Sequence, residues 1–197
     1  MGCLLGKKSK ASLNESQEKR SYKKPNETLI DIKDFQFIEF DSRLPLNKRQ
    51  IFSLLQSWRG IRREMATVGT DMIVELLASD PAVHKLFANF QDLKDKDEMR
   101  VSEEVEALGC KIMEVLDDVA IHLDQYERVM TILNEVAASH SKWIGKEPEM
   151  FMMIKQPFLT SVRLSFGDRF TENIQTVYTA FIDFIVVELI KHTCKIV

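Results

Sequence analysis

The sequence predicts one all-α domain that follows a short N-terminal extension. With 197 residues, of which 45% are hydrophobic and 29% charged, the chain is large enough for a single hydrophobic core. It contains only 7 glycines and 5 prolines, which argues against a β-barrel with many tight turns. Over most of its length, apolar residues recur at intervals of three and four, as they do on one face of an α-helix.

The first helix is predicted to begin after Asn47. The side chains of Asn47 and Gln50 can form a capping box, while Leu46 and Ile51 stand where a hydrophobic staple would pair them. Beyond this start, the apolar positions follow one helical face: Ile51, Leu54, Leu55, Trp58 and Ile61.

Six or seven helices of mixed length are expected in all. After the first, they are predicted over about 68–79, from 101 to 119, from 129 to near Gly145, and over about 149–166 and 172–193. A short turn after Pro81 and a charged surface loop over 92–100 separate the second helix from the third, and Asp95 or Asp97 is available as a helix cap.

Two segments before the first helix differ in composition. Residues 9–26 are rich in polar and charged types without apolar periodicity, so we expect them to be disordered. Residues 35–40 alternate apolar and polar types, but a single strand would have no partner, and we interpret them as an extended arm that packs on the domain. We therefore divide the chain into a largely disordered extension over 1–45, a domain over 46–194 and a C-terminal tail over 195–197.

Composition excludes several functional classes. The net charge of −3 provides no basic field, so nucleic acid is not an expected partner. Cys3, Cys110 and Cys194 are too few for a disulfide framework, which indicates a reducing, intracellular compartment. Neither a G-x-S-x-G motif nor a Gly-rich phosphate loop occurs. The longest apolar stretch, over 177–190, is short of the roughly 20 apolar residues of a membrane-spanning helix, so we expect none.

His140 is the most informative of the four histidines. The other three are His84, His122 and His192, and no pair has metal-binding spacing. His140 follows Leu133 and Val136 on the apolar stripe of its helix, where an unpaired imidazole would be costly. Such a residue is either a hydrogen-bonded core histidine or the kind of axial ligand that haem iron requires.

Four features in fixed order accompany this histidine, and together they resemble a globin from residue 46 to about residue 192. They are an early tryptophan, a Pro-x5-Phe-x2-Phe pattern, a Leu-Gly pair and an Ala-x-Ser-His ending: Trp58; Pro81, Phe87 and Phe90; Leu108 and Gly109; Ala137, Ser139 and His140. The resemblance implies a globin fold, a three-on-three helical sandwich, that holds haem b and binds a diatomic gas.

The resemblance also assigns residues to this cofactor site. It implies that His140 binds the iron and that Phe87 packs on the porphyrin, while the opposite side is lined by Ile73, Leu108 and Ile112. We add Val136, one turn before His140, to the cofactor-binding residues. Globins usually place a histidine where this chain has Leu108, so the distal pocket is expected to be apolar, and dioxygen should suffer more than carbon monoxide from the missing hydrogen bond.

The N-terminus predicts lipid attachment. Gly2 and Cys3 resemble an N-myristoylation site beside a palmitoylation cysteine, although Gly6 stands where Ser or Thr is usual. Residues 1–24 carry a net charge of +5 against −8 for the rest of the chain. One acyl chain binds only marginally, whereas a second chain or a basic segment on anionic lipid makes the attachment stable. Cys194 begins a formal C-a-a-X ending, but valine is not one of its usual last residues.

These features predict a haem globin attached to the cytoplasmic face of a membrane, with the plasma membrane as the first choice. A tethered globin is poorly suited to bulk oxygen transport, so we favour gas sensing or redox signalling with an electron donor or signalling protein as partner. A haem-free adaptor that binds a partner protein is one alternative. The other is a haem enzyme acting on nitrite or superoxide, for which the sequence offers no distinct catalytic residue.

Overall fold

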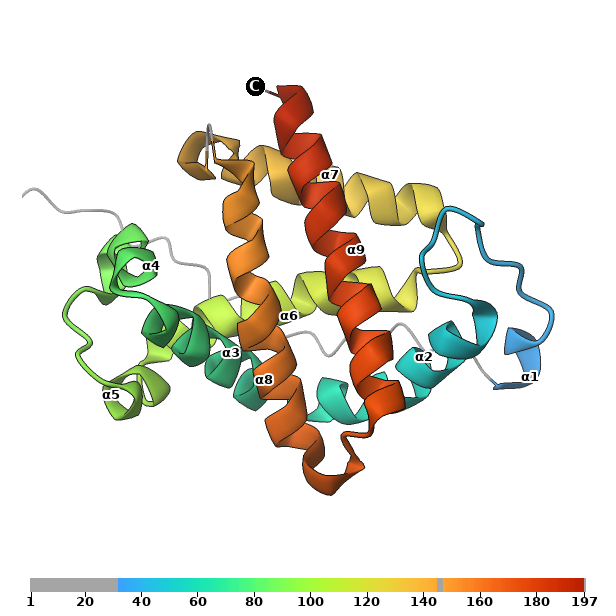
Figure 1. Cartoon of the computed structure of the whole chain (residues 1–197), viewed down its shortest axis with the longest axis horizontal. Helices are drawn as coiled ribbons and strands as arrows, with labels where there is room; N and C mark the ends of the chain where they lie inside the picture. Colours follow the sequence, from blue (N-terminus) through green and yellow to red (C-terminus); the bar gives the residue numbers. More distant parts are fainter. Residues whose placement is uncertain (1–31, 145–146, 197) are drawn as a thin grey trace, which may run out of the picture.

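The computed structural model describes residues 32–144 and 147–196, and these residues form helices and their connections (Figure 1). The prediction of an all-α fold is confirmed. The α-helices are α1 (Ile32–Phe35), α2 (Lys48–Arg63), α3 (Met65–Ser79), α4 (Pro81–Leu86), α5 (Lys96–Arg100), α6 (Glu103–Ile121), α7 (Tyr126–Ile144), α8 (Lys155–Phe166) and α9 (Glu172–Ile196). Short 3-10 helices lie between some of them: η1 (Ala88–Phe90), η2 (Pro148–Ile154) and η3 (Gly167–Arg169).

The predicted capping box opens α2. The Asn47 side chain accepts a hydrogen bond from the Gln50 backbone N–H at 3.0 Å, and the Gln50 side chain accepts one from the Asn47 N–H at 2.9 Å. Leu46 and Ile51 are both buried, as a hydrophobic staple requires. Two otherwise unpaired donors are thereby satisfied at the first long helix of the chain.

Several short elements differ from the prediction. The segment after Pro81 is the helix α4 instead of a turn, and Asp80 caps it by accepting from the Ala82 N–H at 2.7 Å. Asp95 caps α5, which lies inside the predicted charged loop, whereas α6 is capped by Ser102. Residues 148–154 form η2 before α8 begins. Elements of this length are too short to show a helical period in the sequence.

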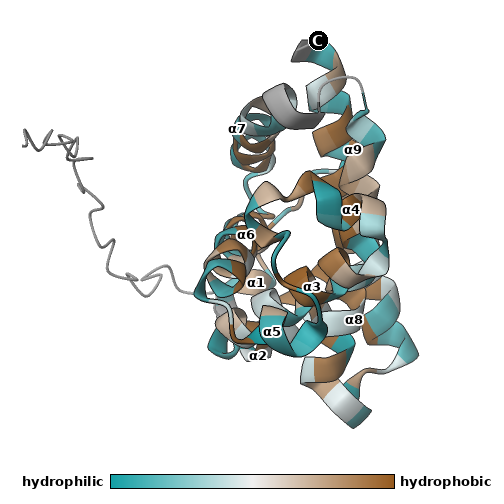
Figure 2. Cartoon of the chain, turned by 90° about the vertical axis from the view of Figure 1, so that its left-hand side faces the viewer, coloured by the Kyte–Doolittle hydropathy of each residue, from teal (hydrophilic) through white to brown (hydrophobic). Residues whose placement is uncertain are grey.

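The helices form two crossing layers. Figure 1 shows α8 and α9 in front of α6 and α7, and the view turned by 90° in Figure 2 separates the two groups. Between the layers, α3 packs on both α6 and α8, α7 packs on α9, and α2 contacts α6 and α9. The apolar helical faces predicted from the sequence therefore meet between the layers.

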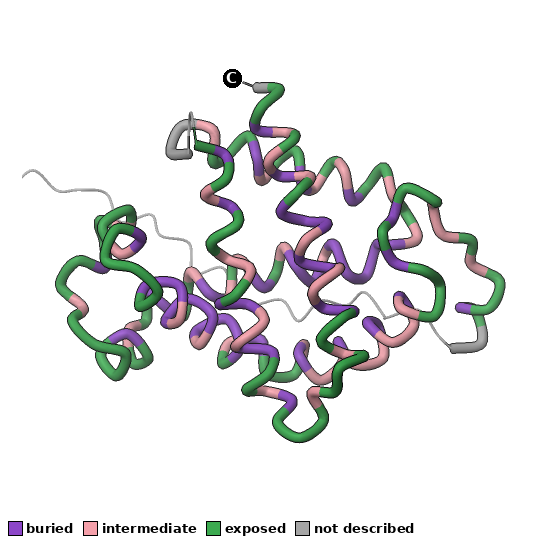
Figure 3. The backbone as a smooth tube through the Cα atoms, in the orientation of Figure 1, coloured by how far each residue is buried: buried purple, intermediate pink, exposed green. Residues whose placement is uncertain are grey.

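Trp58 of α2 lies at the centre of the aromatic core. Its fully buried ring contacts those of Phe158, Tyr178 and Phe181 at centroid separations of 5.5 to 6.5 Å. Burial raises the pKa of the Tyr178 hydroxyl, which lies 3.2 Å from the hydroxyl of Ser57. Figure 3 shows the buried stretches concentrated where these helices cross. The aromatic contacts hold α2 against α8 and α9.

A buried carboxylate joins α2 to α6. Asp117 is only 3% exposed and accepts a hydrogen bond from the Trp58 indole N–H at 2.8 Å, while the Arg62 guanidinium lies 3.0 Å from the same oxygen. Burial raises the pKa of Asp117, and its bonds to Trp58 and Arg62 act in the opposite direction. Because an unpaired charge here would be costly, these contacts specify how α6 lies on α2.

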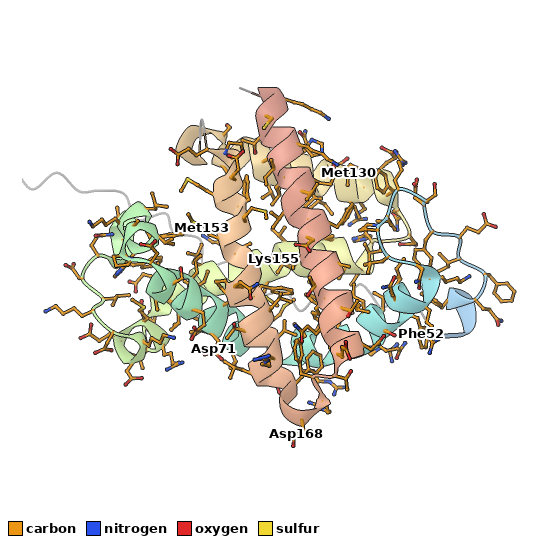
Figure 4. The ribbon with its side chains drawn as sticks, in the orientation of Figure 1. Phe52, Asp71, Met130, Met153, Lys155 and Asp168 are labelled. Atoms are coloured by element: carbon orange, nitrogen blue, oxygen red, sulfur yellow. The ribbon has the colours of Figure 1, made fainter. Side chains whose placement is uncertain are left out.

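By length and hydropathy alone, α9 could cross a membrane, contrary to the expectation from the sequence. In this fold it serves as a core helix, with Phe181, Ile185 and Leu189 buried. Lys155 of α8 lies between α8 and α9 (Figure 4), where its ammonium group pairs with the Asp183 carboxylate at 2.6 Å. The apolar composition of α9 is therefore explained by its packing in the domain.

The segment from Phe35 to Leu46, here called the arm, packs on the domain as predicted. It differs from the prediction in that its first residue ends a single turn of helix, α1. The ring of Phe35 is buried beside those of Phe40 and Phe52, at centroid separations of 5.4 and 5.2 Å. Phe35 of the arm is therefore part of the packed structure, whereas the segment predicted to be disordered, residues 9–26, lies outside the described residues.

Arg43 fastens the arm to the start of α7. Its guanidinium carbon lies 3.7 Å from the centre of the Tyr126 ring, and one terminal nitrogen, Nη2, pairs with both Asp41 at 2.6 Å and Glu127 at 2.7 Å. The hydrogen bonds from Arg43 lower the pKa of Asp41 to about 2. The arm thus contacts the helix that carries His140 at that helix's first turn.

The backbones of α3 and α6 meet at two buried glycines. A methyl group on Gly69 would lie 2.6 Å from the Gly109 carbonyl carbon, and one on Gly109 would lie 2.4 Å from the Gly69 carbonyl carbon. Real side chains do not approach backbone atoms so closely, so neither position has room for a larger residue. This contact brings the two helices together one residue after Leu108.

We predict that Gly109→Ala forces α3 and α6 apart and lowers the free energy of unfolding by about 1–3 kcal/mol, the usual cost of overpacking. Gly60→Ala is the matched control, because the nearest atom to its added methyl group, on the Phe166 ring, is 4.0 Å away. Alanine should stabilise α2 there by up to about 1 kcal/mol. Chemical denaturation measures both effects, and equal stability of the two variants would contradict the close approach.

Candidate functional site

His140 lies in the last part of α7, and its imidazole is exposed. The apolar stripe predicted for this helix is buried at Leu133 and Ala137 but does not extend to His140, which is a correction to the sequence analysis. The described ring that contacts it is Phe151 of η2, at a centroid separation of 5.3 Å. The imidazole is therefore accessible to a ligand on the side of α7 that the core leaves open.

Hydrogen bonds determine which nitrogen of His140 carries a proton. Nδ1 lies 2.8 Å from the Val136 carbonyl oxygen, which can only accept, so Nδ1 is the donor. The Ser139 hydroxyl lies 3.0 Å from Nδ1 and donates to the same carbonyl at 2.7 Å. In the neutral ring, Nε2 then holds the lone pair, as a metal ligand must.

The residues assigned to the distal side of the haem, across from His140, lie on α3 and α6. Ile73 is fully buried one turn after Gly69, while Leu108 and Ile112 are half-buried and flank Gly109. All three pack against one continuous apolar cluster. Because the glycine contact fixes α3 on α6, it also fixes these three side chains relative to one another.

Phe87 stands between α4 and η1. Its ring is half-buried and stacks on the buried ring of Phe90 at a centroid separation of 6.0 Å. The predicted site residues therefore come from α3, α6, α7 and the connection between α4 and η1, and Figure 2 shows α7 above α6. Val136 is half-buried on α7, and its carbonyl orients His140.

The globin family model matches residues 70–189, which is more than half of the chain. The chain belongs to the globin family. Cytoglobin-2 of Oryzias latipes is 24% identical over 135 residues, which cover 68% of this globin and 75% of that protein. Globin-1 of Petromyzon marinus is 23% identical over 106 residues, which cover 54% of this chain and 71% of that protein.

A solved structure confirms the predicted globin fold. The crystal structure described as a hexacoordinated heme protein from an anhydrobiotic tardigrade superposes with a TM-score of 0.73 at 23% sequence identity. The superposition covers 78% of this globin and 99% of the tardigrade chain. At this level of identity, the comparison establishes the fold, while the family match carries the functional inference.

Membership of the globin family implies a haem cofactor, and the residues of this globin fit one. In the neutral ring of His140, the hydrogen bond at Nδ1 leaves the lone pair on Nε2, which is what an axial ligand supplies. Within residues 32–144 and 147–196 no group of three metal-binding side chains occurs. Phe87, Leu108 and Ile112 provide apolar surface that is still partly open.

A cavity of about 550 Å³ lies elsewhere, between the arm and the start of α7, and Arg43, Asp124 and Tyr126 are among the residues that border it. None of the residues assigned to the haem lines this cavity. It is open and lined largely by charged groups, unlike the apolar surroundings that a porphyrin needs.

Two other residues near Leu108 have ordinary surroundings. Lys111 is exposed on α6. Burial raises the pKa of the Cys110 thiol, and the neighbouring carboxylates of Glu106 and Glu114 raise it further, so the reactive thiolate is disfavoured.

Of the residues considered for lipid attachment, Gly2 and Cys3 lie outside the described residues, while Cys194 is free and exposed on α9.

Sequence reasoning missed the supports of the site. Gly69, which meets Gly109, was not singled out, although a glycine inside a helix is unfavourable unless close packing requires it. His84 and Gln91 form hydrogen bonds across residues 84–91, here called the Phe87 corner. Neither residue was assigned any role. No motif in a single sequence identifies such hydrogen bonds, because they depend on how the loop folds back.

Proposed function

We propose that this globin holds haem b through His140, binds a diatomic gas on the Leu108 side, and acts in gas sensing or redox signalling at the cytoplasmic face of the plasma membrane. The observation that carries the proposal is the hydrogen bond from His140 Nδ1 to the Val136 carbonyl, which directs a lone pair to Nε2. When bound, haem supplies an iron that takes a diatomic ligand and exchanges one electron.

The distal residues determine which gases are favoured. The side chains of Ile73, Leu108 and Ile112 carry no N–H or O–H group, so they offer a gas ligand no hydrogen bond. A hydrogen bond to a charged acceptor is worth roughly 1.5–3 kcal/mol, or about a ten- to a hundredfold change in affinity. Ligands that gain negative charge, such as dioxygen, therefore lose more stabilisation than carbon monoxide.

Leu108 also bears on the number of axial ligands. The tardigrade protein is described as hexacoordinated. In this globin, a leucine side chain at position 108 has no lone pair and cannot donate to a metal. We therefore propose five-coordinate ferrous iron with His140 as its one protein ligand.

Two sequence features support membrane attachment. Gly2 and Cys3 fit dual acylation, and residues 1–24 carry a net charge of +5, which favours anionic lipid. Two acyl signals give stable attachment where one does not. Attachment favours a local signalling role over bulk transport, because a tethered protein cannot carry its ligand across a cell.

His140→Ala should abolish stable haem incorporation, because no other protein ligand is assigned to the iron. Absorption spectra of the purified ferric, ferrous and carbonyl forms measure the effect, and they also separate a haem protein from a haem-free adaptor. His192→Ala, at a half-buried position on α9, is the matched control and should keep the spectrum. An unchanged spectrum in the His140 variant would remove this residue from the site.

Leu108→His should introduce the missing donor. We expect dioxygen release and autoxidation to slow by about ten- to a hundredfold, or the imidazole itself to become the sixth ligand. Stopped-flow kinetics distinguish these results from the unmodified protein, which should oxidise quickly. Leu108→Val is the control that keeps the pocket apolar. If the unmodified protein keeps dioxygen for hours, a donor is already present and the apolar pocket is wrong.

Gly2→Ala should release the protein from membranes in a eukaryotic cell, whereas Cys3→Ser should leave partial attachment that salt weakens. The reason is that a single myristoyl chain binds marginally and relies on the basic tail. Cell fractionation of the full-length chain measures both variants, and Cys194→Ser is the control for C-terminal prenylation. Equal membrane association of the native and Gly2→Ala chains would exclude the N-terminal anchor.

A further inference from the structure

The corner that carries Phe87 is closed by a side chain from α4. His84 Nε2 lies 2.7 Å from the Phe90 carbonyl oxygen. Since a carbonyl only accepts, Nε2 carries the proton and donates it. The bond spans six residues and joins the middle of α4 to the end of η1, so it closes the chain into a loop around Phe87.

Gln91 closes the same loop from the other direction. Its side-chain amide donates to the His84 carbonyl at 2.7 Å and to the Phe87 carbonyl at 3.2 Å. These two carbonyls also accept backbone bonds: Phe87 N–H donates to His84 at 3.1 Å, and Phe90 N–H donates to Phe87 at 3.0 Å. The last carbonyls of a helix lack helical partners, and here the Gln91 side chain helps to satisfy them.

Core packing covers only part of Phe87, which lies against the edge of the hydrophobic cluster. The residue is half-buried, and the described ring that contacts it is Phe90. Leu86, immediately before it, is 54% exposed, and Ala88 and Asn89 after it are also exposed. The direction of the Phe87 ring therefore depends on the backbone of the corner, which the side chains of His84 and Gln91 hold.

We propose that His84 and Gln91 are positioning residues that hold Phe87 against the haem. This inference rests on the proposed haem site. The two residues touch neither the iron nor its gas ligand, and they act through the backbone of Phe87. Their loss should allow the corner to open more often, which exposes one face of the porphyrin to water and increases haem release without removing the iron ligand.

The experiment compares four variants with the unmodified chain. His84→Ala removes the hydrogen bond to the Phe90 carbonyl, and Gln91→Ala removes the hydrogen bonds to the His84 and Phe87 carbonyls. His84→Gln retains an amide donor near the position of Nε2 and should restore the bond to Phe90. Asn89→Ala is the matched control, because Asn89 is exposed in the same corner and makes no hydrogen bond there with a described side chain.

Four measurements together separate a positioning role from a general loss of stability. Haem transfer to an excess of an acceptor globin apoprotein gives the dissociation rate. Hydrogen exchange of the Phe87 and Phe90 amides, with and without haem, reports corner opening. The ring protons of Phe87 in the carbonyl form report its place over the porphyrin through their chemical shift. The unfolding midpoint of the haem-free chain controls for overall stability.

We expect His84→Ala and Gln91→Ala to release haem about three- to tenfold faster than the unmodified chain, as one lost hydrogen bond predicts. Their corner amides should exchange faster by a similar factor, the Phe87 shifts should move, and His84→Gln and Asn89→Ala should match the unmodified chain. Unchanged exchange and unchanged Phe87 shifts in both alanine variants overturn the proposal, as does a lower unfolding midpoint with no change at Phe87. If the unmodified chain takes up no haem, the proposed function fails, and the amide exchange still tests whether the hydrogen bonds of His84 and Gln91 hold the corner closed.

Discussion

The contact between Gly69 and Gly109 is the constraint on which the rest of the site depends. It lets the backbones of α3 and α6 touch, so the position of one helix determines that of the other to within a fraction of a side chain. Leu108 precedes one glycine, and Ile73 lies one turn beyond the other. In the proposed gas pocket, the distance between these side chains is therefore set by the close approach of the two backbones at the glycines.

The other end of α6 is held by polar contacts. Asp117 is buried, and both Trp58 and Arg62 of α2 bind its carboxylate. Such a network contributes little net stability when intact, since the desolvation of the charges offsets their attraction. It adds specificity, because any other placement of α6 leaves a buried carboxylate or a buried indole N–H without a partner. Close packing at Gly109 and polar pairing at Asp117 together fix both halves of one helix.

The sequence was most informative where a single helix carries its own signals. The capping box at Asn47 and the periodicity through Trp58 predicted α2, because both depend on neighbours within about four residues. Short helices were missed, since α4 and α5 span less than two turns. Asp95, one of the two residues predicted to be available as a cap, caps α5, whereas Ser102 caps α6: Asp95, Asp97 and Ser102 are all competent caps, and only the folded chain selects among them.

For the candidate site, the residue types could be predicted, whereas their support could not. His140, Phe87 and Leu108 were proposed from their order and spacing, and they lie on α7, between α4 and η1, and on α6, respectively. The exposure of His140 was not expected, because a helical stripe does not reveal where the neighbouring helices end. The bond from His140 to the Val136 carbonyl lies within one helical turn, yet it depends on a rotamer that sequence does not specify.

The position of the arm determines on which side the chain enters the described domain. The chain enters the described domain at α1, which Figure 1 shows at the opposite side of the molecule from α4. Arg43 fastens this entry point to α7 on the same side. The chain therefore joins the domain on the side away from α4 and Phe87, so the entry of the chain and the proposed haem site lie at different ends of the fold.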